Sequence, residues 1–189
     1  MELIPGRFSG WHAAPAASLT SHQKYWLLRP GALTNGLRAL GEFNLRVARE
    51  RVSSLRSDEA WMLARAPGSP IWLREICMGI NGTDSVFARS FTPLHASHGL
   101  WQGMRRLRTR PLAEMLYHDP QITRSGFMVA RLHGQHPIYR SMRFYFGSAC
   151  PQPNRILARC SVFWRLGQPL LVAEAFLPAF WELAGNRRP

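Results

Sequence analysis

The ten residues from Pro169 to Pro178 constrain the fold of this chain more than any other stretch. Between the two prolines lie seven apolar side chains and one carboxylate, Glu174. Because side chains alternate along a strand, Glu174 would share a face with Val172 and Phe176. A run this apolar predicts a strand buried on one or both faces. An ionised carboxylate there is costly unless a cation or a hydrogen-bond donor meets it, so Glu174 needs a partner.

A second apolar stretch carries charges of both signs. Pro70–Ile80 reads P-I-W-L-R-E-I-C-M-G-I, and its neighbours Arg74 and Glu75 must point to opposite faces of a strand. A buried Arg and a buried Glu each need a partner. One explanation is that Arg74 and Glu174 face a common cavity, where Arg binds a carboxylate and Glu lies near a hydroxyl or a proton in transit. The other is a structural Arg–Glu ion pair, or a strand edge where both reach solvent.

The remaining periodicity predicts a mainly antiparallel sheet with inserted helices. Asn81-Gly82 is a strong signal for a hairpin turn, and Gly167-Gln168 is a tight turn into the last strand. Strands are predicted at 42–52, 70–80, 85–91, 122–132, 156–166 and 169–178, and helices at 18–28, 32–40, 94–107 and 111–117, with one helical turn near 58–63. The segment 133–153 shows no clear pattern. Because hairpins dominate and β-α-β repetition is absent, the expected class is α+β, with about six strands.

The length of 189 residues and the apolar content of 46% suit one globular domain. Residues 1–17 mix Pro, Gly, Ser and Ala with isolated apolar residues, and we expect them to form a poorly ordered leader. The domain is expected to span 18–180, followed by a short basic tail at 181–189.

Charge and cysteine content limit the function classes. The net charge is +13, and among the 24 basic residues Lys24 is the single lysine. This excess permits nucleic acid, an anionic membrane surface or a small anionic substrate as partner. The three cysteines show no C-x-x-C spacing, which argues against disulfides and zinc and fits a reduced cytoplasmic compartment. No stretch approaches the roughly 20 apolar residues of a transmembrane helix.

Two further patterns point to other sites. His95 and His98 have a spacing that two metal ligands on a helix could use, but no third ligand accompanies them, so no metal is expected. The cluster at 105–110 contains four arginines. Nucleic-acid binding would usually add stacking aromatics or a recognition helix. A basic nucleic-acid-binding module stays open as an alternative, to be tested by salt-dependent binding to generic DNA.

Several segments, taken in order, resemble the chorismate lyase family. They are W-L-R-E-I at 72–76, A-R-S-F-T-P at 88–93, R-P-L-A-E-M-L at 110–116 and G-Q-P-L-L-V-A-E-A-F-L-P at 167–178, with V-A-R-E at 47–50 as a further element. The resemblance implies a single α+β domain with an antiparallel six-stranded sheet and helical flaps over a buried site. It also implies a cofactor-free bacterial enzyme that converts chorismate to 4-hydroxybenzoate and pyruvate for ubiquinone biosynthesis.

The resemblance also implies roles for particular residues. Arg74 would bind the ring carboxylate, and Glu174 would lie at the hydroxyl end of the ring. The backbone of Leu112 would contact the ligand, and Leu33 stands where the family has a pocket-lining Met. Arg49 is a candidate for the second carboxylate of chorismate, and whether Arg159 reaches substrate stays open at this stage.

An alternative belongs to another class of protein. The ligand-sensing domain of some GntR-type transcription regulators is similar in fold to chorismate lyase and binds small molecules without catalysis. Those regulators carry an N-terminal winged-helix domain, for which the ~17 residues before the first predicted helix are too few. We therefore expect a monomeric enzyme with chorismate and 4-hydroxybenzoate as partners, without nucleic acid or stable membrane insertion.

Overall fold

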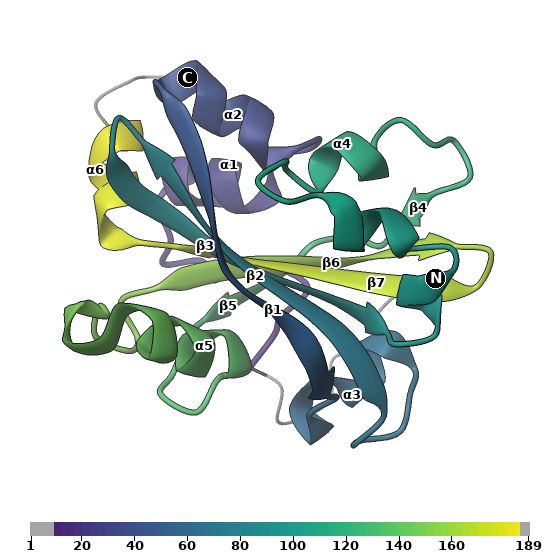
Figure 1. Cartoon of the computed structure of the whole chain (residues 1–189). Coiled ribbons are helices and arrows are strands. Elements are labelled where there is room, and N and C mark those ends of the chain that lie inside the picture. The colour runs from purple at the N-terminus through teal and green to yellow at the C-terminus, as the bar shows by residue number, and fades with distance from the viewer. Residues whose placement is uncertain (1–9, 186–189) are drawn as a thin grey trace.

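One antiparallel sheet carries helices on both of its faces (Figure 1). The computed structural model describes residues 10–185. The helices are α1 (Ser21–Leu28), α2 (Leu33–Leu40), α3 (Ser57–Leu63), η1 (Ala96–His98), η2 (Gln102–Arg106), α4 (Ala113–Leu116), α5 (Pro137–Phe146), η3 (Gly147–Ala149) and α6 (Pro178–Gly185), where η marks a 3₁₀ turn. The strands are β1 (Phe43–Ser54), β2 (Pro70–Ile80), β3 (Thr83–Pro93), β4 (Thr123–Arg124), β5 (Met128–Arg131), β6 (Leu157–Arg165) and β7 (Gln168–Phe176).

The strands lie in the order β1-β2-β3-β7-β6-β4, and β5 also pairs with β6. Two tight hairpins set the registers that matter for the site. Asn81 and Gly82 both have positive φ, as do Leu166 and Gly167, which is the conformation of two-residue hairpin turns that match the twist of the strands. The predicted turn at Asn81-Gly82 is confirmed, and the second turn lies one residue earlier than Gly167-Gln168.

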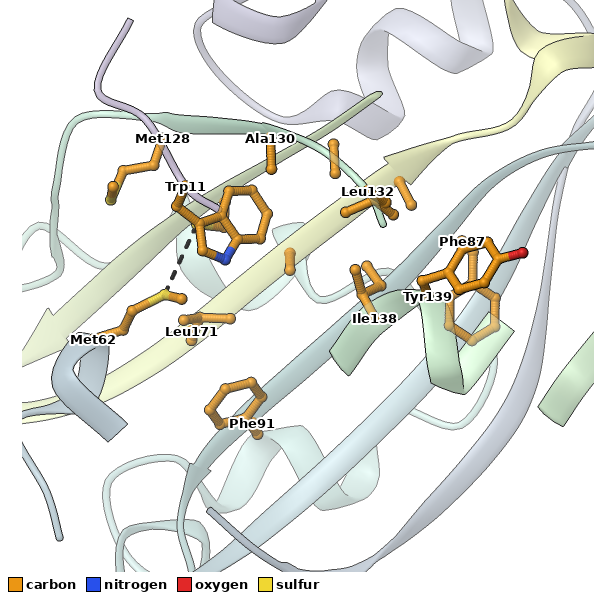
Figure 2. Close-up of a cluster of buried hydrophobic side chains, with 14 of the residues drawn as sticks. Trp11, Met62, Phe87, Phe91, Met128, Ala130, Leu132, Ile138, Tyr139 and Leu171 are labelled. Carbon is orange, nitrogen blue, oxygen red and sulfur yellow. Dashed lines mark hydrogen bonds between the residues drawn. The ribbon is translucent and has the colours of Figure 1, made fainter. Parts of the chain in front are cut away.

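The two faces of the sheet carry different helices. In Figure 1, α1, α2 and α4 lie above the sheet, and α3 and α5 lie below it. The lower layer holds the largest apolar cluster, in which Trp11, Phe91 and Leu171 pack together with the side chains drawn in Figure 2. The upper layer contains two smaller clusters, one with residues of α1, α2 and α6 and one beneath η1, η2 and α4. No helix within residues 10–185 is long and apolar enough to cross a membrane.

The α+β class is confirmed, but several elements differ from the prediction. The sheet has seven strands, because the segment predicted as one strand at 122–132 is broken between β4 and β5. The segment 94–107 forms the two short turns η1 and η2 instead of one helix, and it contains Gly99 and Gly103, which have low helix propensity. The unassigned segment 133–153 contains α5.

Both expected domain boundaries are wrong. Trp11 is buried against the edge of the His136 ring, and His12 pairs with Val129 at the margin of the sheet, so the folded domain begins before residue 18. At the other end, α6 continues to Gly185, five residues beyond the expected limit at 180. Residues 1–9 of the predicted leader and residues 186–189 of the predicted tail lie outside the described residues.

Candidate active site

A cavity of about 50 Å³ lies on the upper face of the sheet. Its floor is made by alternate residues of β2, β3, β7 and β6, and its cover comes from residues 32–34, at the start of α2, and from the segment 111–117 around α4. Three of the five predicted site residues line it, namely Leu33, Leu112 and Glu174, and so does Arg159, whose role the sequence left open. The alternation predicted for the last strand therefore places Glu174 in a cavity between sheet and helices.

The partner of Glu174 is Arg159, which lies directly opposite on β6. The Arg159 Nε donates a hydrogen bond of 2.6 Å to Glu174 Oε2, and the Arg159 Nη1 donates to the carbonyl oxygens of Trp26 and Arg29. Only 2% of Arg159 is exposed. This buried guanidinium holds one carboxylate oxygen in place and leaves Glu174 Oε1 available to a ligand.

Arg74 is buried on the same face of the sheet, beyond the other end of the cavity. Its Nη1 donates to Glu50 Oε1 at 2.5 Å, and its Nη2 donates to the carbonyl oxygens of Arg108 and Arg110, which precede α4. Its Nε is buried and has no hydrogen-bond partner within the described part of the chain. Arg74 itself does not line the cavity, whereas its cross-strand neighbour Ser90 does. These contacts tie the cover segment to the sheet.

The strand registers give the separation of Arg74 and Glu174. Glu174 pairs with Ala88 and Ala88 pairs with Ile76, so Glu174 is two strands away from Arg74 and two residues further along the sheet. At about 4.8 Å between strands and 3.4 Å per residue, their Cα atoms are about 12 Å apart. The two side chains therefore form no ion pair with each other, and each has its own partner of opposite charge.

The expectation that Arg49 would share this site is wrong. A β-bulge between Val47 and Arg49 moves Arg49 to the lower face, where its Nε donates to Glu75 Oε2 at 2.8 Å. An inserted residue has this effect because side chains on a strand alternate between faces. The bulge also places Glu50 beside Arg74. With simple alternation, Glu50 would lie on the opposite face of the sheet.

Arg124 is a cavity residue that the sequence did not single out. It lies in β4, lines the cavity, and has its Nη1 buried without a hydrogen-bond partner among residues 10–185. The ring of Phe127 lies between two guanidinium groups, 4.1 Å from that of Arg124 and 4.4 Å from that of Arg159. One end of the cavity therefore carries two cations for one carboxylate, Glu174.

Tyr117 borders the same end of the cavity. Burial raises the pKa of its phenol, the nearby guanidinium of Arg124 opposes that shift, and the carboxylate of Glu174 adds to it. The Tyr117 ring packs edge-on against Phe163, 6.0 Å away. The phenol therefore stays protonated near neutral pH and can donate a hydrogen bond into the cavity.

The other predicted candidates do not converge on a site. His95 contacts Gln168 and His98 contacts Arg105, so the two imidazoles have separate partners. Within the described residues, no three His, Cys, Asp or Glu side chains are arranged to hold a metal ion. In the basic cluster at 105–110, the Arg105 guanidinium lies 3.9 Å from the centre of the Trp72 ring, so this arginine packs against the protein.

The sequence from residue 9 to residue 186 matches the family described as Chorismate lyase. The chain belongs to the chorismate lyase family. Two relatives named "Probable chorismate pyruvate-lyase", from Bordetella pertussis and Bordetella avium, are each 55% identical to it; the alignments cover 93% and 92% of this chain and 92% and 86% of the relatives. A "Probable chorismate pyruvate-lyase 1" from Pseudomonas entomophila is 37% identical, with 94% of each chain covered. The resemblance inferred from the ordered segments is confirmed.

Solved structures show a wider group with the same fold as this chorismate lyase family member. The effector domain of PhnF from Mycobacterium smegmatis matches with a TM-score of 0.53 at 13% identity, over 79% of this chain and 90% of that one. A GntR-family regulator from Bacillus cereus matches with a TM-score of 0.51 at 8% identity, over 74% and 94%. At these identities the similarity concerns the fold alone.

Proposed function

We propose that the chain is a chorismate pyruvate-lyase, a carbon–oxygen lyase that converts chorismate to 4-hydroxybenzoate and pyruvate. One observation carries this proposal: proteins of that name share 55% of its residues over 93% of its length. The cavity supports it, because a carboxylate and two arginines line one end of a largely apolar space that has the buried Arg74 beyond its other end. The product serves ubiquinone biosynthesis.

The reaction breaks the bond between ring carbon C3 and the ether oxygen. The bonding electrons leave with the enolpyruvyl group, and the ring develops positive charge. Loss of the proton on C4 then makes the ring aromatic and leaves the 4-hydroxyl in place, while the enolpyruvate takes up a proton at its methylene carbon and becomes pyruvate. Because aromatisation provides driving force, the protein has mainly to orient a dianion and to stabilise developing charge.

Glu174 acts at the hydroxyl end of the ring in this proposal. Its Oε1, left available by the Arg159 contact to Oε2, accepts a hydrogen bond from the 4-hydroxyl. Its negative charge stabilises the positive charge that develops on the ring, in a site where water is scarce and the interaction is strong. Arg159 acts through Glu174 as a positioning residue, because its other hydrogen bonds go to backbone carbonyls.

Arg74 binds the ring carboxylate from the other end. Its Nε is the donor left without a protein partner, and a carboxylate is a strong acceptor for it. The backbone N–H of Leu112, at the N-cap of α4, adds a second donor to the same carboxylate. Leu33 packs on the ring from α2.

Arg124 binds the second carboxylate, the one on the enolpyruvyl group. The Nη1 of Arg124 is buried at the cavity and unpaired within the described residues, whereas Arg159 is committed to Glu174 and to two carbonyls. A buried guanidinium nitrogen without an acceptor is costly, and a substrate carboxylate relieves that cost. Arg124 therefore takes the role that the sequence had suggested for Arg49.

Substrate entry requires the cover to move. A cavity of about 150 Å³ is known to accommodate benzene, whereas the cavity here measures about 50 Å³. The start of α2 and the segment 111–117 cover the cavity, so they are the parts that open in this proposal. This arrangement fits the flaps implied by the family.

Incubating the purified chain with chorismate tests the proposed activity. We expect 4-hydroxybenzoate and pyruvate in equal amounts, measured by chromatography and by a coupled lactate dehydrogenase assay. Formation of 3-hydroxybenzoate would indicate a different chorismate-using enzyme. Saturable binding of 4-hydroxybenzoate without any turnover would favour the non-catalytic alternative, a ligand-binding domain like those of the GntR-type regulators.

We also propose a cytoplasmic location and a monomeric state. Cys77, Cys150 and Cys160 are free thiols, which suits a reducing compartment. Size-exclusion chromatography with light scattering tests the monomer, for which a mass of 21.5 kDa is expected.

A further inference from the structure

A second cleft, of about 650 Å³, lies on the opposite face of the strands that build the reaction cavity. It is bordered by the end of β1, the start of α3 and the first turns of α5, on the lower side of the sheet in Figure 1. Five arginines line it, from four different elements of the fold or their ends: Arg49, Arg51, Arg56, Arg89 and Arg140. The lining contains a single carboxylate, Glu75.

Acidic neighbours neutralise three of these five arginines. Arg49 pairs with Glu75, Arg56 lies 3.4 Å from Asp58, and Arg89 is hydrogen-bonded to Glu59. The two others, Arg51 and Arg140, are exposed and form no ion pair within residues 10–185. The cleft therefore has an excess of two positive charges, on side chains that approach it from β1 and from α5.

The floor of the cleft has an unused donor. Arg89 is 4% exposed, and its Nε has no hydrogen-bond partner in the described part of the chain, because Glu75 Oε1 lies 3.4 Å away without hydrogen-bond geometry. Hydroxyl groups of Ser53, Ser54 and Ser141 also line the cleft. Guanidinium forks and hydroxyl donors around one space match the several acceptor oxygens of a phosphate group.

We propose that this cleft is a binding site for a phosphate group that carries two negative charges, either free or on a larger molecule. The charge excess equals the charge of such a group, and the donors come from opposite walls of the cleft. The site lies across the sheet from the reaction cavity, so the proposal does not depend on the proposed activity. The exposed ring of Phe144, which stacks at 4.5 Å on the guanidinium of Arg49, forms an apolar rim beside the cleft.

Isothermal titration with inorganic phosphate at pH 8 and low salt tests the site. The protein is first saturated with 4-hydroxybenzoate, which fills space in the reaction cavity that phosphate could otherwise enter. We expect one saturable phosphate site, weakened at least about tenfold by Arg51→Gln together with Arg140→Gln, since each substitution removes one charged donor of the phosphate. The matched control is Arg143→Gln, which removes one exposed charge from α5 outside the cleft.

Each outcome of the titration decides the proposal. It is overturned if phosphate does not bind, if the double variant binds as tightly as Arg143→Gln while its circular dichroism spectrum is unchanged, or if malonate, a dicarboxylate, binds more tightly than phosphate. Sedimentation with vesicles that contain phosphatidic acid then distinguishes the source of the phosphate. Loss of vesicle binding in the double variant, but not in the control, assigns the site to a lipid headgroup; equal sedimentation of both assigns it to a soluble phosphate.

Discussion

Replacing Arg124 by Met should weaken the use of chorismate while leaving the stability of the fold nearly unchanged. Arg124 forms no ion pair within residues 10–185, and its buried Nη1 has no hydrogen-bond partner there. Its favourable contacts are the stacking on Phe127 at 4.1 Å and a contact with the Tyr117 phenol. The unliganded protein therefore uses this arginine very little, whereas the proposed function gives it the enolpyruvyl carboxylate.

The expected magnitudes follow from these contacts. Loss of the cation–π contact costs about 0.5–2 kcal/mol, and removal of a buried unsatisfied donor returns about 1–3 kcal/mol. The melting temperature should therefore fall by no more than about 4 °C, at 2–4 °C per kcal/mol for a chain of this size. A hydrogen bond to a charged group contributes about 1.5–3 kcal/mol, so kcat/KM for chorismate should fall about 10- to 150-fold.

Two measurements on the same protein test this prediction. Initial rates with chorismate should fall, whereas the dissociation constant of 4-hydroxybenzoate, which lacks the enolpyruvyl carboxylate, should change less than about twofold. Arg106→Met serves as control, because it removes an exposed arginine of η2 outside the cavity. The assignment is refuted if kcat/KM is unchanged in the Arg124 variant. It is also refuted if the affinity for 4-hydroxybenzoate falls in parallel, since Arg124 would then act on the ring and not on the leaving group.

Three other changes have distinct expected results. Arg74→Gln should lower both kcat/KM and the affinity for 4-hydroxybenzoate more than tenfold. It should also lower the melting temperature, because Glu50 loses its partner. An unchanged affinity for 4-hydroxybenzoate would argue against a contact between Arg74 and the ring carboxylate. Glu174→Gln should lower kcat about 100-fold but weaken product binding less than tenfold, and a kcat close to that of the wild type would leave Glu174 with a structural role. Burial, helped by His133, lowers the pKa of His136 to about 3, whereas the unfolded chain protonates near 6.5. The free energy of unfolding should therefore fall as the pH drops from about 6.5 towards 3, and His136→Phe should flatten that slope in urea titrations unless this histidine is not the group responsible.

The partner of Glu174 could have been predicted from the hairpin turn before the last strand, although the pattern of apolar residues alone does not reveal it. A two-residue hairpin loop at Leu166-Gly167 pairs Arg165 with Gln168, and the same register leads six residues further to the pair of Arg159 and Glu174. A predicted turn at Leu166-Gly167, instead of at Gly167-Gln168, gives a strand register in which Glu174 lies opposite Arg159. Turn chemistry and strand register together therefore locate half of the site.

Other parts of the site could not be found in this way. Arg124 lies in a strand of two residues, and Phe127 lies in the break before β5, where neither alternation nor helical periodicity extends far enough to assign a face. The helix α5 begins with Pro137 and has no side-chain cap, and it contains four aromatic rings that suit a strand equally well. Pro137 at the first helical position and the helical spacing of the buried residues favour a helix, and packing against the sheet selects it over a strand.

The position of Arg49 differs from the prediction because one inserted residue in β1 changes which charges lie at the reaction cavity and which lie at the lower cleft. Simple alternation puts Arg49 on the face of Val47 and above the reaction cavity, but the bulge at Ala48 exchanges the faces for the rest of β1. Glu50 then lies beside Arg74 and accepts a hydrogen bond from its Nη1, whereas the Nε of Arg74 stays available to a substrate carboxylate. Arg49 joins the arginines of the lower cleft instead. Without the bulge, Arg49 and Arg51 would lie on the reaction face and Glu50 would lie on the lower face, so Arg74 would lose its carboxylate partner and the cleft would lose two of its five arginines. The bulge therefore separates a site for a carboxylated ring from a site with an excess of positive charge on the two faces of the same strands.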